Sequence, residues 1–320
     1  MKTIGVVGAG FYGAYIALKL ADKGHRVIVF DPEDNTQSAT LHCQARLHSG
    51  MFYVRSLTDL KSCARNFTKF FKLFKPYIYT GFNSYYLIDK DSEVSFNAYK
   101  QICKDNNLSV KEVSLDYVNK HSIQGILKAK EFSIDTEGLL FNLRDKCKNH
   151  PNIEWVQDRV TSVNQEVMII TSDRVFRVDT CILASYGNNF KFLKNLGYPV
   201  DHITYPLPVL KFKDNLPKDC HAVVDGDFWS SIVKQDYKLL TSKVSIYEST
   251  YGDKCIDLMQ KYIPELEVKI LDISLAKKVV MKGTKEAQIT KYGNIYAVFS
   301  GKLTNIFDII NQIENLEEIY

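Results

Sequence analysis

The stretch that decides the fold runs from residue 4 to residue 31 and reads IGVVGAGFYGAYIALKLADKGHRVIVFD. It opens with a β-branched apolar run at 4–7, which is typical of a buried parallel strand. A helical pattern follows and ends near Gly24, a residue type that commonly terminates helices. Residues 26–30 form a second apolar run. A strand, a helix and a second strand in this order predict a βαβ unit.

The turn between the first strand and the helix carries three glycines with a recognisable spacing. Gly8 permits the tight turn, Gly10 lets a pyrophosphate approach the backbone, and Gly13 allows the helix to pack closely on the strand. The helix N-terminus presents N–H groups and positive partial charge to a phosphate. Asp31 ends the second strand, where it can accept hydrogen bonds from ribose hydroxyls. The pattern predicts a dinucleotide site and by itself fits NAD and FAD equally.

The sequence after the second strand separates the two dinucleotides. Residues 38–50 read SATLHCQARLHSG, and a long amphipathic helical pattern at 56–75 and strand-rich sequence follow. NAD enzymes usually continue with further βα units of the nucleotide fold. The chain instead resembles the FAD-dependent oxidoreductases of the D-amino-acid oxidase superfamily, which includes glycine and sarcosine oxidases, glycerol-3-phosphate dehydrogenases and L-2-hydroxyglutarate oxidases.

The resemblance reappears along the chain. Residues 46–53 are similar to the His-small-Gly segment of the hydroxyglutarate and glycerol-phosphate members. His42 and Arg46 are spaced like the pair near the flavin in sarcosine-oxidase-like members. Residues 160–187 resemble the β-hairpin and strand that lead into the family's second glycine turn. Residues 294–310 resemble its terminal strand, glycine turn and helix under the flavin pyrimidine.

The resemblance implies that FAD is the cofactor and that a defined set of residues contacts it. This set is Gly8, Gly10, Phe11, Tyr12, Gly13, Asp31, Thr40, Leu41, His42, Ala45, Arg46, Val160, Gly187, Gly301 and Lys302. A glycine turn that opens a terminal helix at Lys302 would present N–H groups to negative charge on the flavin. The chain departs from the family at 43–45, which read Cys-Gln-Ala, and at 300–302, where the glycine-rich turn is reduced.

Two residues are candidates for the chemistry. His48 can accept the proton of a substrate hydroxyl or ammonium group, because an unperturbed imidazole titrates close to cellular pH. Arg46 can hold a substrate carboxylate in a bidentate manner or contact the cofactor phosphates. His42 or His48 could instead carry a covalent link to the flavin, as in some relatives. Each histidine could also be a hydrogen-bonded loop residue without a chemical role.

These observations predict an α/β protein in which a Rossmann-like FAD-binding domain is interleaved with a substrate domain built on a mixed or antiparallel sheet. Residues 1–76, 134–203 and 284–320 are assigned to the FAD-binding domain. Residues 77–133 and 204–283 are assigned to the substrate domain.

Composition limits the partners. The chain has 320 residues and a formal net charge of +4 without a concentrated basic stretch, so nucleic acid is not expected to bind. It has seven cysteines, an odd number without any C-x-x-C pair, which argues against a disulfide framework and a structural zinc site. Residues 1–3 lead directly into a strand pattern, and no apolar run is long enough to span a bilayer. We therefore expect a reduced, soluble, cytoplasmic protein without a metal site.

The predicted activity is FAD-dependent removal of hydride from a carbon that bears a hydroxyl or amine group on a small polar molecule. Segment 48–50 favours a 2-hydroxyacid slightly, and oxygen or a quinone would reoxidise the flavin. The alternatives are an amine or amino-acid oxidase on the same fold, a nicotinamide-dependent dehydrogenase, and an FAD-binding protein without catalysis.

Overall fold

The computed structural model describes residues 1–225, 229–234, 236–242, 244, 250–281 and 287–316. The chain divides into two compact units, and the division falls inside strands β14 and β18. Unit 1 comprises Met1–Leu41, Thr136–Tyr205 and Lys277–Tyr320. Unit 2 comprises His42–Asp135 and Pro206–Ala276.

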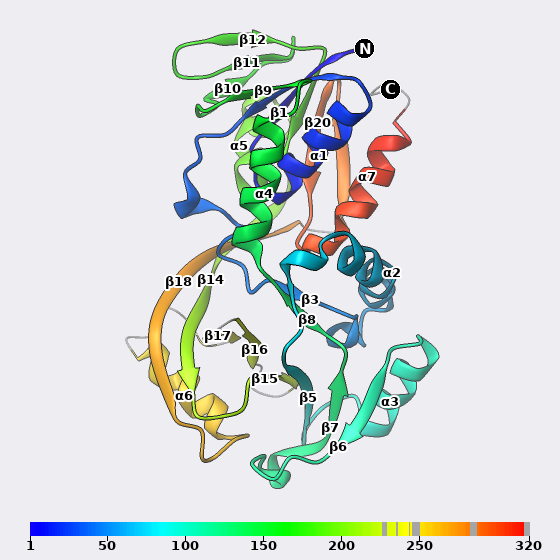
Figure 1. The fold of residues 1–320 in the computed structure, drawn as a ribbon, viewed down its shortest axis with the longest axis vertical. Coiled ribbons are helices and arrows are strands. Elements are labelled where there is room, and N and C mark those ends of the chain that lie inside the picture. The colour runs from blue at the N-terminus through cyan, green and yellow to red at the C-terminus, as the bar shows by residue number, and fades with distance from the viewer. Residues whose placement is uncertain (226–228, 235, 243, 245–249, 282–286, 317–320) are drawn as a thin grey trace. The chain divides into compact units, whose positions relative to one another are not determined.

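Unit 1 is built on a six-stranded sheet with the strand order β19-β20-β13-β1-β2-β9 (Figure 1). These strands are β1 (Thr3–Val7), β2 (Arg26–Phe30), β9 (Ile153–Val156), β13 (Thr180–Leu183), β19 (Gln288–Tyr292) and β20 (Ile295–Phe299). All neighbours are parallel except β19 and β20. Strand β1 lies between β13 and β2, and Ile4 and Val6 are completely buried. The continuous apolar run read in the sequence therefore corresponds to a central parallel strand.

The described residues of unit 1 also form four α-helices and a small sheet. The helices are α1 (Phe11–Asp22), α4 (Thr136–Lys148), α5 (Asn189–Asn195) and α7 (Ile306–Glu314), and the antiparallel sheet contains β10 (Ser162–Val163), β11 (Met168–Ile170) and β12 (Val175–Arg177). Helices α1 and α4 lie side by side. Val163 and Ile169 of the small sheet pack into one apolar cluster with Phe30 and Leu183 of the large one.

Unit 2 contains a mixed sheet of eight strands in the order β18-β14-β17-β16-β15-β5-β7-β6. These strands are β5 (Asn83–Asp89), β6 (Val110–Val113), β7 (Ile123–Ala129), β14 (His202–Asp214), β15 (Asp219–Val224), β16 (Trp229–Val233), β17 (Lys238–Ser242) and β18 (Val268–Met281). A second sheet has the order β3-β8-β4 and consists of β3 (Arg46–Leu47), β8 (Phe132–Ile134) and β4 (Ile78–Tyr79). Strands β5 and β15 are parallel neighbours, whereas β5 and β7 are antiparallel.

Two of the three described α-helices of unit 2 start at a serine whose side chain caps the helix. The three helices are α2 (Leu57–Leu73), α3 (Phe96–Asp105) and α6 (Tyr251–Gln260). Ser56 caps α2 by accepting a hydrogen bond from the Asp59 amide, and Ser95 caps α3 in the same way. On α2, Phe67 and Phe71 both contact the ring of Phe132, so aromatic residues of this amphipathic helix pack inside unit 2.

The α/β architecture with a mixed second sheet is confirmed, and two details differ from the sequence analysis. Residues 42–76 fall in unit 2 and not with the glycine loop, because β3 pairs with β8 and α2 packs on Phe132. The terminal helix begins at Ile306, after a 3₁₀ turn at Leu303–Asn305, and not at Lys302. Lys302 is extended, and its amide is bound by the Ser300 hydroxyl oxygen at 3.3 Å. The predicted boundary at 283/284 lies outside the described residues.

Candidate functional site

The glycine loop of unit 1 has a geometry that only glycine satisfies at two positions. Gly8 has φ +94°, which L side chains rarely adopt, and its amide donates to the Phe30 carbonyl at 2.8 Å. A Cβ atom at Gly13 would lie 1.8 Å from the Gly8 oxygen, so helix α1 contacts the loop backbone directly. A Cβ atom at Gly10 would meet only the Thr40 hydroxyl, at 3.5 Å. The space over Gly10 is therefore open, as a pyrophosphate cradle requires.

Residues around the start of α1 tie the loop to segments that are distant in sequence. The Thr40 hydroxyl accepts a hydrogen bond from the Phe11 amide at 3.1 Å. The Tyr12 hydroxyl donates to the Lys302 carbonyl at 2.5 Å, and burial raises the pKa of Tyr12. The structure thus brings the Thr40 hydroxyl and the Lys302 carbonyl to the start of α1.

Asp31 and Arg144 both form hydrogen bonds to the backbone of the glycine loop. The Asp31 carboxylate accepts hydrogen bonds from the Ala9 amide at 2.6 Å and the Glu33 amide at 2.7 Å. Arg144 on α4 donates to the Ala9 carbonyl at 2.9 Å, to Asn35 at 2.8 Å and to Asp31 at 3.2 Å. Asp31 is 7% exposed, so its carboxylate organises the loop in addition to any bond it makes to a ribose.

The second glycine turn lies against the first. A Cβ atom at Gly8 would come within 3.0 Å of the Ala184 oxygen and the Ser185 Cα atom. The fully buried side chain of Asn189 accepts from the Ser185 amide at 2.9 Å and donates to the Val298 carbonyl at 2.9 Å. The carboxyl ends of β1, β13 and β20 are therefore linked by backbone and amide contacts, and this edge is where open α/β sheets bind ligands.

The remaining predicted cofactor residues have different surroundings. In unit 1, Val160 belongs to the apolar core at 9% exposure, and Leu41 is half-buried. A Cβ atom at Gly187 would meet the Val279 side chain at 3.3 Å, whereas one at Gly301 would meet nothing within 4 Å. In unit 2, His42 is half-buried and Ala45 is buried with φ +56°.

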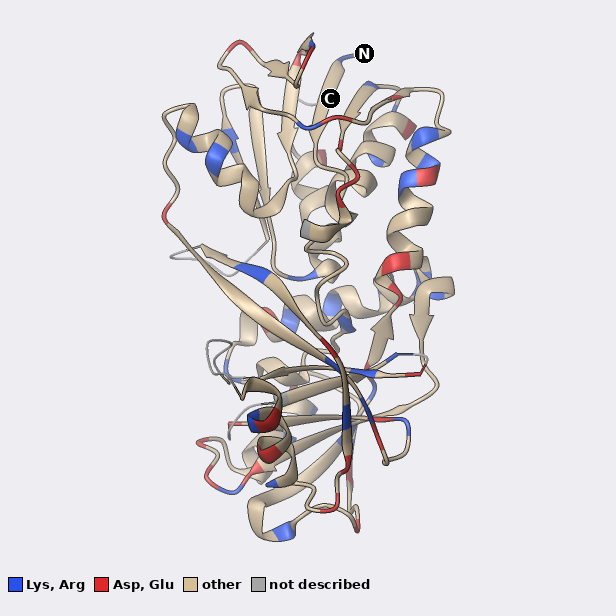
Figure 2. Cartoon of the chain, turned by 90° about the vertical axis from the view of Figure 1, so that its left-hand side faces the viewer, with Lys and Arg blue, Asp and Glu red and all other residues tan. Residues whose placement is uncertain are grey.

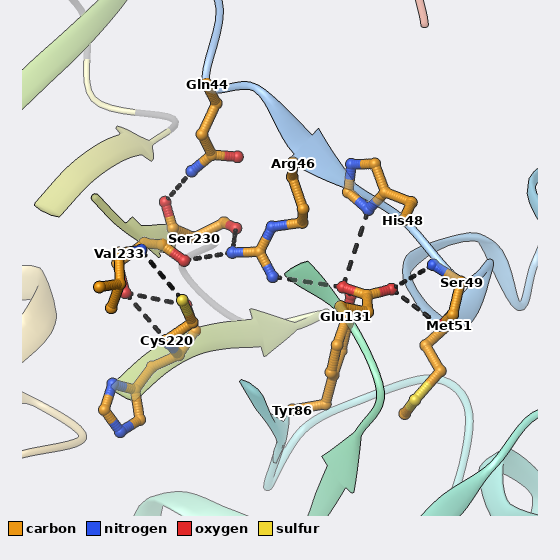
Figure 3. Close-up of polar contacts among 12 residues, drawn as sticks. Gln44, Arg46, His48, Ser49, Met51, Tyr86, Glu131, Cys220, Ser230 and Val233 are labelled. Carbon is orange, nitrogen blue, oxygen red and sulfur yellow. Dashed lines mark hydrogen bonds and ion pairs between the residues drawn. The ribbon is translucent and has the colours of Figure 1, made fainter. Parts of the chain in front are cut away.

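The candidate catalytic residues of unit 2 lie in one buried polar cluster (Figure 3). Arg46 donates to the Ser230 hydroxyl at 2.8 Å and to the Ser231 carbonyl, and its Nη1 atom lies 3.4 Å from the Glu131 carboxylate. The Arg46 side chain is 1% exposed. Both terminal nitrogens of Arg46 are thus already bound within unit 2.

Glu131 is the centre of this cluster. Its Oε1 atom accepts from the Ser49 amide at 2.8 Å and the Ser49 hydroxyl at 2.9 Å, and its Oε2 atom accepts from the Tyr86 hydroxyl at 2.6 Å. Burial works to raise the pKa of Glu131, but the charges of His48 and Arg46 and these hydrogen bonds outweigh it, so the pKa is lowered. The carboxylate is therefore ionised at neutral pH although its side chain is completely buried.

His48 connects this cluster to the surface of unit 2. Its Nδ1 atom lies 3.9 Å from the Glu131 Oε2 atom, an ion-pair distance when the imidazole is protonated. The His48 side chain is 20% exposed, and its ring contacts those of Phe52 and Tyr53. Figure 3 shows one ring nitrogen directed at Glu131 and the other directed away from it.

Sequence reasoning missed Arg144 and Glu131. Arg144 occurs in a helix with other charged residues, and its partner Ala9 is 135 positions away. Glu131 follows Lys128 and Lys130 and has the sequence pattern of a solvated turn. A buried charged residue can be predicted from a sequence only when its partner is close to it in the chain. The charged partners of Arg144 and Glu131 are 113 and 85 positions away.

Figure 2 shows charged residues of both signs dispersed over the described parts of the chain. None of the helices within the described ranges is both long enough and apolar enough to cross a membrane. The part of the chain that the structure describes also contains no group of three or more His, Cys, Asp or Glu residues suited to hold a metal ion.

The fold is shared with solved flavoenzymes. Glycine oxidase from Geobacillus kaustophilus has a TM-score of 0.79 and 10% identity, with 98% of this chain and 94% of that chain covered. L-α-glycerophosphate oxidase from Mycoplasma pneumoniae, solved with FAD bound, has a TM-score of 0.75 and 13% identity over 98% and 94% of the two chains. NikD, an amino acid oxidase of nikkomycin biosynthesis, has a TM-score of 0.78 and 12% identity over 99% and 95%.

Sequence comparison supports the same assignment. An FAD-dependent monooxygenase from Aspergillus flavus, kojA, is 25% identical over 246 residues, which are 70% of this chain and 56% of the relative. This chain thus matches only about half the length of that relative. Residues 3–219, more than half of the chain, match the family of FAD dependent oxidoreductases. The protein therefore belongs to the FAD dependent oxidoreductase (DAO) family, as its sequence predicts, and its cofactor is FAD.

Proposed function

We propose that this protein oxidises a carbon that bears a hydroxyl group on a small polar molecule, with His48 as the proton acceptor. The observation that carries the proposal is the placement of His48, a partly exposed imidazole held 3.9 Å from the buried carboxylate of Glu131. Bound FAD supplies the acceptor for the hydride. The residues of the chain bind and orient the substrate and accept its hydroxyl proton.

A base at this position favours an alcohol over an amine. A neutral amine can lose hydride without prior loss of a proton, whereas an alcohol must release its O–H proton as the carbonyl forms. A carboxylate beside the imidazole stabilises the protonated form that results. The His48–Glu131 pair therefore supplies the base that an alcohol requires in the oxidation step itself, whereas an amine requires a base only to deprotonate its ammonium form.

Arg46 has a different role in this proposal from the one the sequence suggested. Its two terminal nitrogens are bound by Glu131, Ser230 and Ser231, and its side chain is 1% exposed. We therefore assign Arg46 to charge compensation of Glu131 and not to the capture of a substrate carboxylate. A 2-hydroxyacid stays the first substrate to test because segment 48–50 resembles enzymes of that class.

The proposed cofactor site is the loop Gly8–Gly13 with Asp31, Thr40, Gly187, Gly301 and Lys302 around it. Its fit to FAD is supported by the open space over Gly10 and by the contacts of Phe11 with Thr40 and of Tyr12 with Lys302. We propose unit 1 as the FAD-binding domain and unit 2 as the substrate domain. Oxygen or a quinone would reoxidise the flavin.

Anaerobic absorbance spectroscopy tests the proposal. The FAD-loaded protein is mixed without oxygen with pairs of compounds that share a carbon skeleton, one a 2-hydroxyacid and the other the 2-amino acid. It is mixed separately with glycerol phosphate and with NADPH. Loss of the flavin band with a hydroxyl compound supports the proposal. Loss only with amino compounds would establish an amino-acid oxidase, the activity in the names of several structural neighbours. Loss only with NADPH would indicate a monooxygenase, as the named curated relatives are.

A further inference from the structure

The buried carboxylate of Glu131 has so far been given one role, the stabilisation of protonated His48. The Glu131 side chain is 0% exposed, and an ionised carboxylate is costly to remove from water unless it is paired and hydrogen-bonded. Three donors on Ser49 and Tyr86 and the guanidinium of Arg46 satisfy it. Four groups from three residues in two separate segments thus converge on one carboxylate.

The strand register explains why Glu131 faces His48. Strands β3 and β8 are antiparallel, with Arg46 opposite Ser133 and Leu47 opposite Phe132. Both strands end there, and extending this register by one residue would set His48 opposite Glu131. The carboxylate also holds the amide of Ser49, the residue after His48, at 2.8 Å. Glu131 therefore binds the backbone beside the imidazole, and its Oε2 atom is 3.9 Å from the Nδ1 atom of His48.

We propose that Glu131 is a positioning residue for the His48 base, because its carboxylate selects the tautomer in which Nδ1 carries the proton and Nε2 is free to accept one. The proposal rests on the proposed function of His48. As the substrate is oxidised, its O–H bond breaks and the proton passes to Nε2. The carbon hydrogen leaves with its electron pair to bound FAD, and a carbonyl group forms. The imidazolium that results is paired with Glu131.

The groups around His48 determine the direction of its response to pH. Glu131 faces Nδ1, and the Tyr53 ring lies 5.5 Å from the imidazole. Burial raises the pKa of Tyr53, so this phenol is neutral where the imidazole titrates. Arg46 is positive and is separated from His48 by Glu131, and Tyr86 is a neutral donor to the same carboxylate. Removal of the Glu131 charge would therefore leave His48 beside an uncompensated arginine.

The direct test is the tautomer of His48 in the FAD-loaded protein. Nitrogen-15 NMR of the histidine-labelled holoenzyme, assigned with His48→Gln, distinguishes a protonated Nδ1 from a protonated Nε2. We expect the neutral imidazole to carry its proton on Nδ1. A proton on Nε2 would overturn the proposal, and this measurement requires no variant of Glu131.

A second measurement uses Glu131→Gln and, as a matched control, Lys130→Gln, which removes the charge of the adjacent exposed residue. The rate of flavin reduction rises with pH as the base loses its proton. The midpoint of this rise should fall by about 1 pH unit or more in Glu131→Gln, because the carboxylate no longer favours the imidazolium. It should be unchanged in Lys130→Gln. The same midpoint in Glu131→Gln and the native protein would contradict the proposal.

The two proposals fail in different ways. If His48→Gln reduces its flavin at the native rate, the proposed function of His48 is wrong, whatever tautomer the NMR shows. If His48→Gln is slow but Glu131→Gln keeps the native tautomer and pH midpoint, His48 is the base and Glu131 does not position it.

Discussion

A pair of glycine substitutions separates the packing role of the glycine loop from its role in cofactor binding. In Gly13→Ala the new methyl carbon would lie 1.8 Å from the Gly8 oxygen, whereas real Cβ atoms do not come closer than 3.0 Å. The loop and helix α1 must therefore move apart by at least 1.2 Å, the difference between these distances. The loop and the helix contact each other here through backbone atoms, which cannot rotate away. We therefore expect the free energy of unfolding to fall by about 3 kcal/mol, the upper end of the usual cost of overpacking.

Gly10→Ala should behave differently. Gly10 has φ −64°, which any residue adopts, and its new methyl group would meet only the Thr40 hydroxyl at 3.5 Å. The FAD-free variant should thus unfold within about 0.5 kcal/mol of the native protein. The methyl group would occupy the space proposed for the pyrophosphate, so FAD affinity should fall roughly 10- to 100-fold, or about 1.4–2.8 kcal/mol.

Two assays measure these effects. Chemical unfolding of the FAD-free proteins gives the stability of each variant, and titration of flavin fluorescence gives its dissociation constant for FAD. The expected result is a stable Gly10→Ala protein with weak FAD binding and a destabilised Gly13→Ala protein. Native FAD affinity in Gly10→Ala would refute the placement of the pyrophosphate over this residue.

Three further predictions concern buried ionisable side chains. Arg144→Met leaves the Asp31 carboxylate without its cation, so the FAD-free variant should lose about 3 kcal/mol of unfolding free energy. The variant should also bind FAD more weakly in the fluorescence titration. Unchanged values of both would show that Arg144 does not stabilise the loop. Burial lowers the pKa of His221 to about 3, so folding disfavours its protonation and stability should fall as the pH drops from about 6.5 to about 3. His221→Gln should make that slope shallower by up to ~1.4 kcal/mol per pH unit in chemical unfolding, and an equal slope would contradict this. The pKa of Glu131 is lowered on folding, so the stability that its ionised carboxylate contributes should be present above about pH 4.5 and lost as the pH falls through the pKa of the folded state. The native protein should therefore be more stable than Glu131→Gln at neutral pH but not in acid. A difference in stability that persists in acid would contradict this.

The sequence was sufficient for features that depend on local order. The apolar run 4–7, the three glycines and the run 26–30 predict the first βαβ unit because each residue's role is decided by its immediate neighbours. The same holds for α2, whose start at Ser56 is a capping signal. The resemblance to the FAD-dependent superfamily rested on further short segments, at 38–50, 46–53, 160–187 and 294–310, and the family match confirms it.

The sequence was insufficient to predict features that depend on the pairing of distant strands. Residues 42–76 follow the nucleotide-binding strand in sequence, yet β3 pairs with β8, about 85 residues further on, and this placed them in unit 2. The burial of Glu131 follows from the same pairing. The sequence suggested that Arg46 binds a substrate carboxylate. In the structure its guanidinium donates instead to Ser230 and Ser231, which belong to a strand that is distant in the sequence.

The rate of anaerobic flavin reduction in His48→Gln tests the central claim most directly. It is compared with the native rate, using the hydroxyl compound that reduces the native protein and with FAD bound in both. Loss of a general base typically slows a reaction by about 10²- to 10⁴-fold, and the proposed role of His48 predicts a decrease in this range. Reduction of the variant at the native rate would contradict that role.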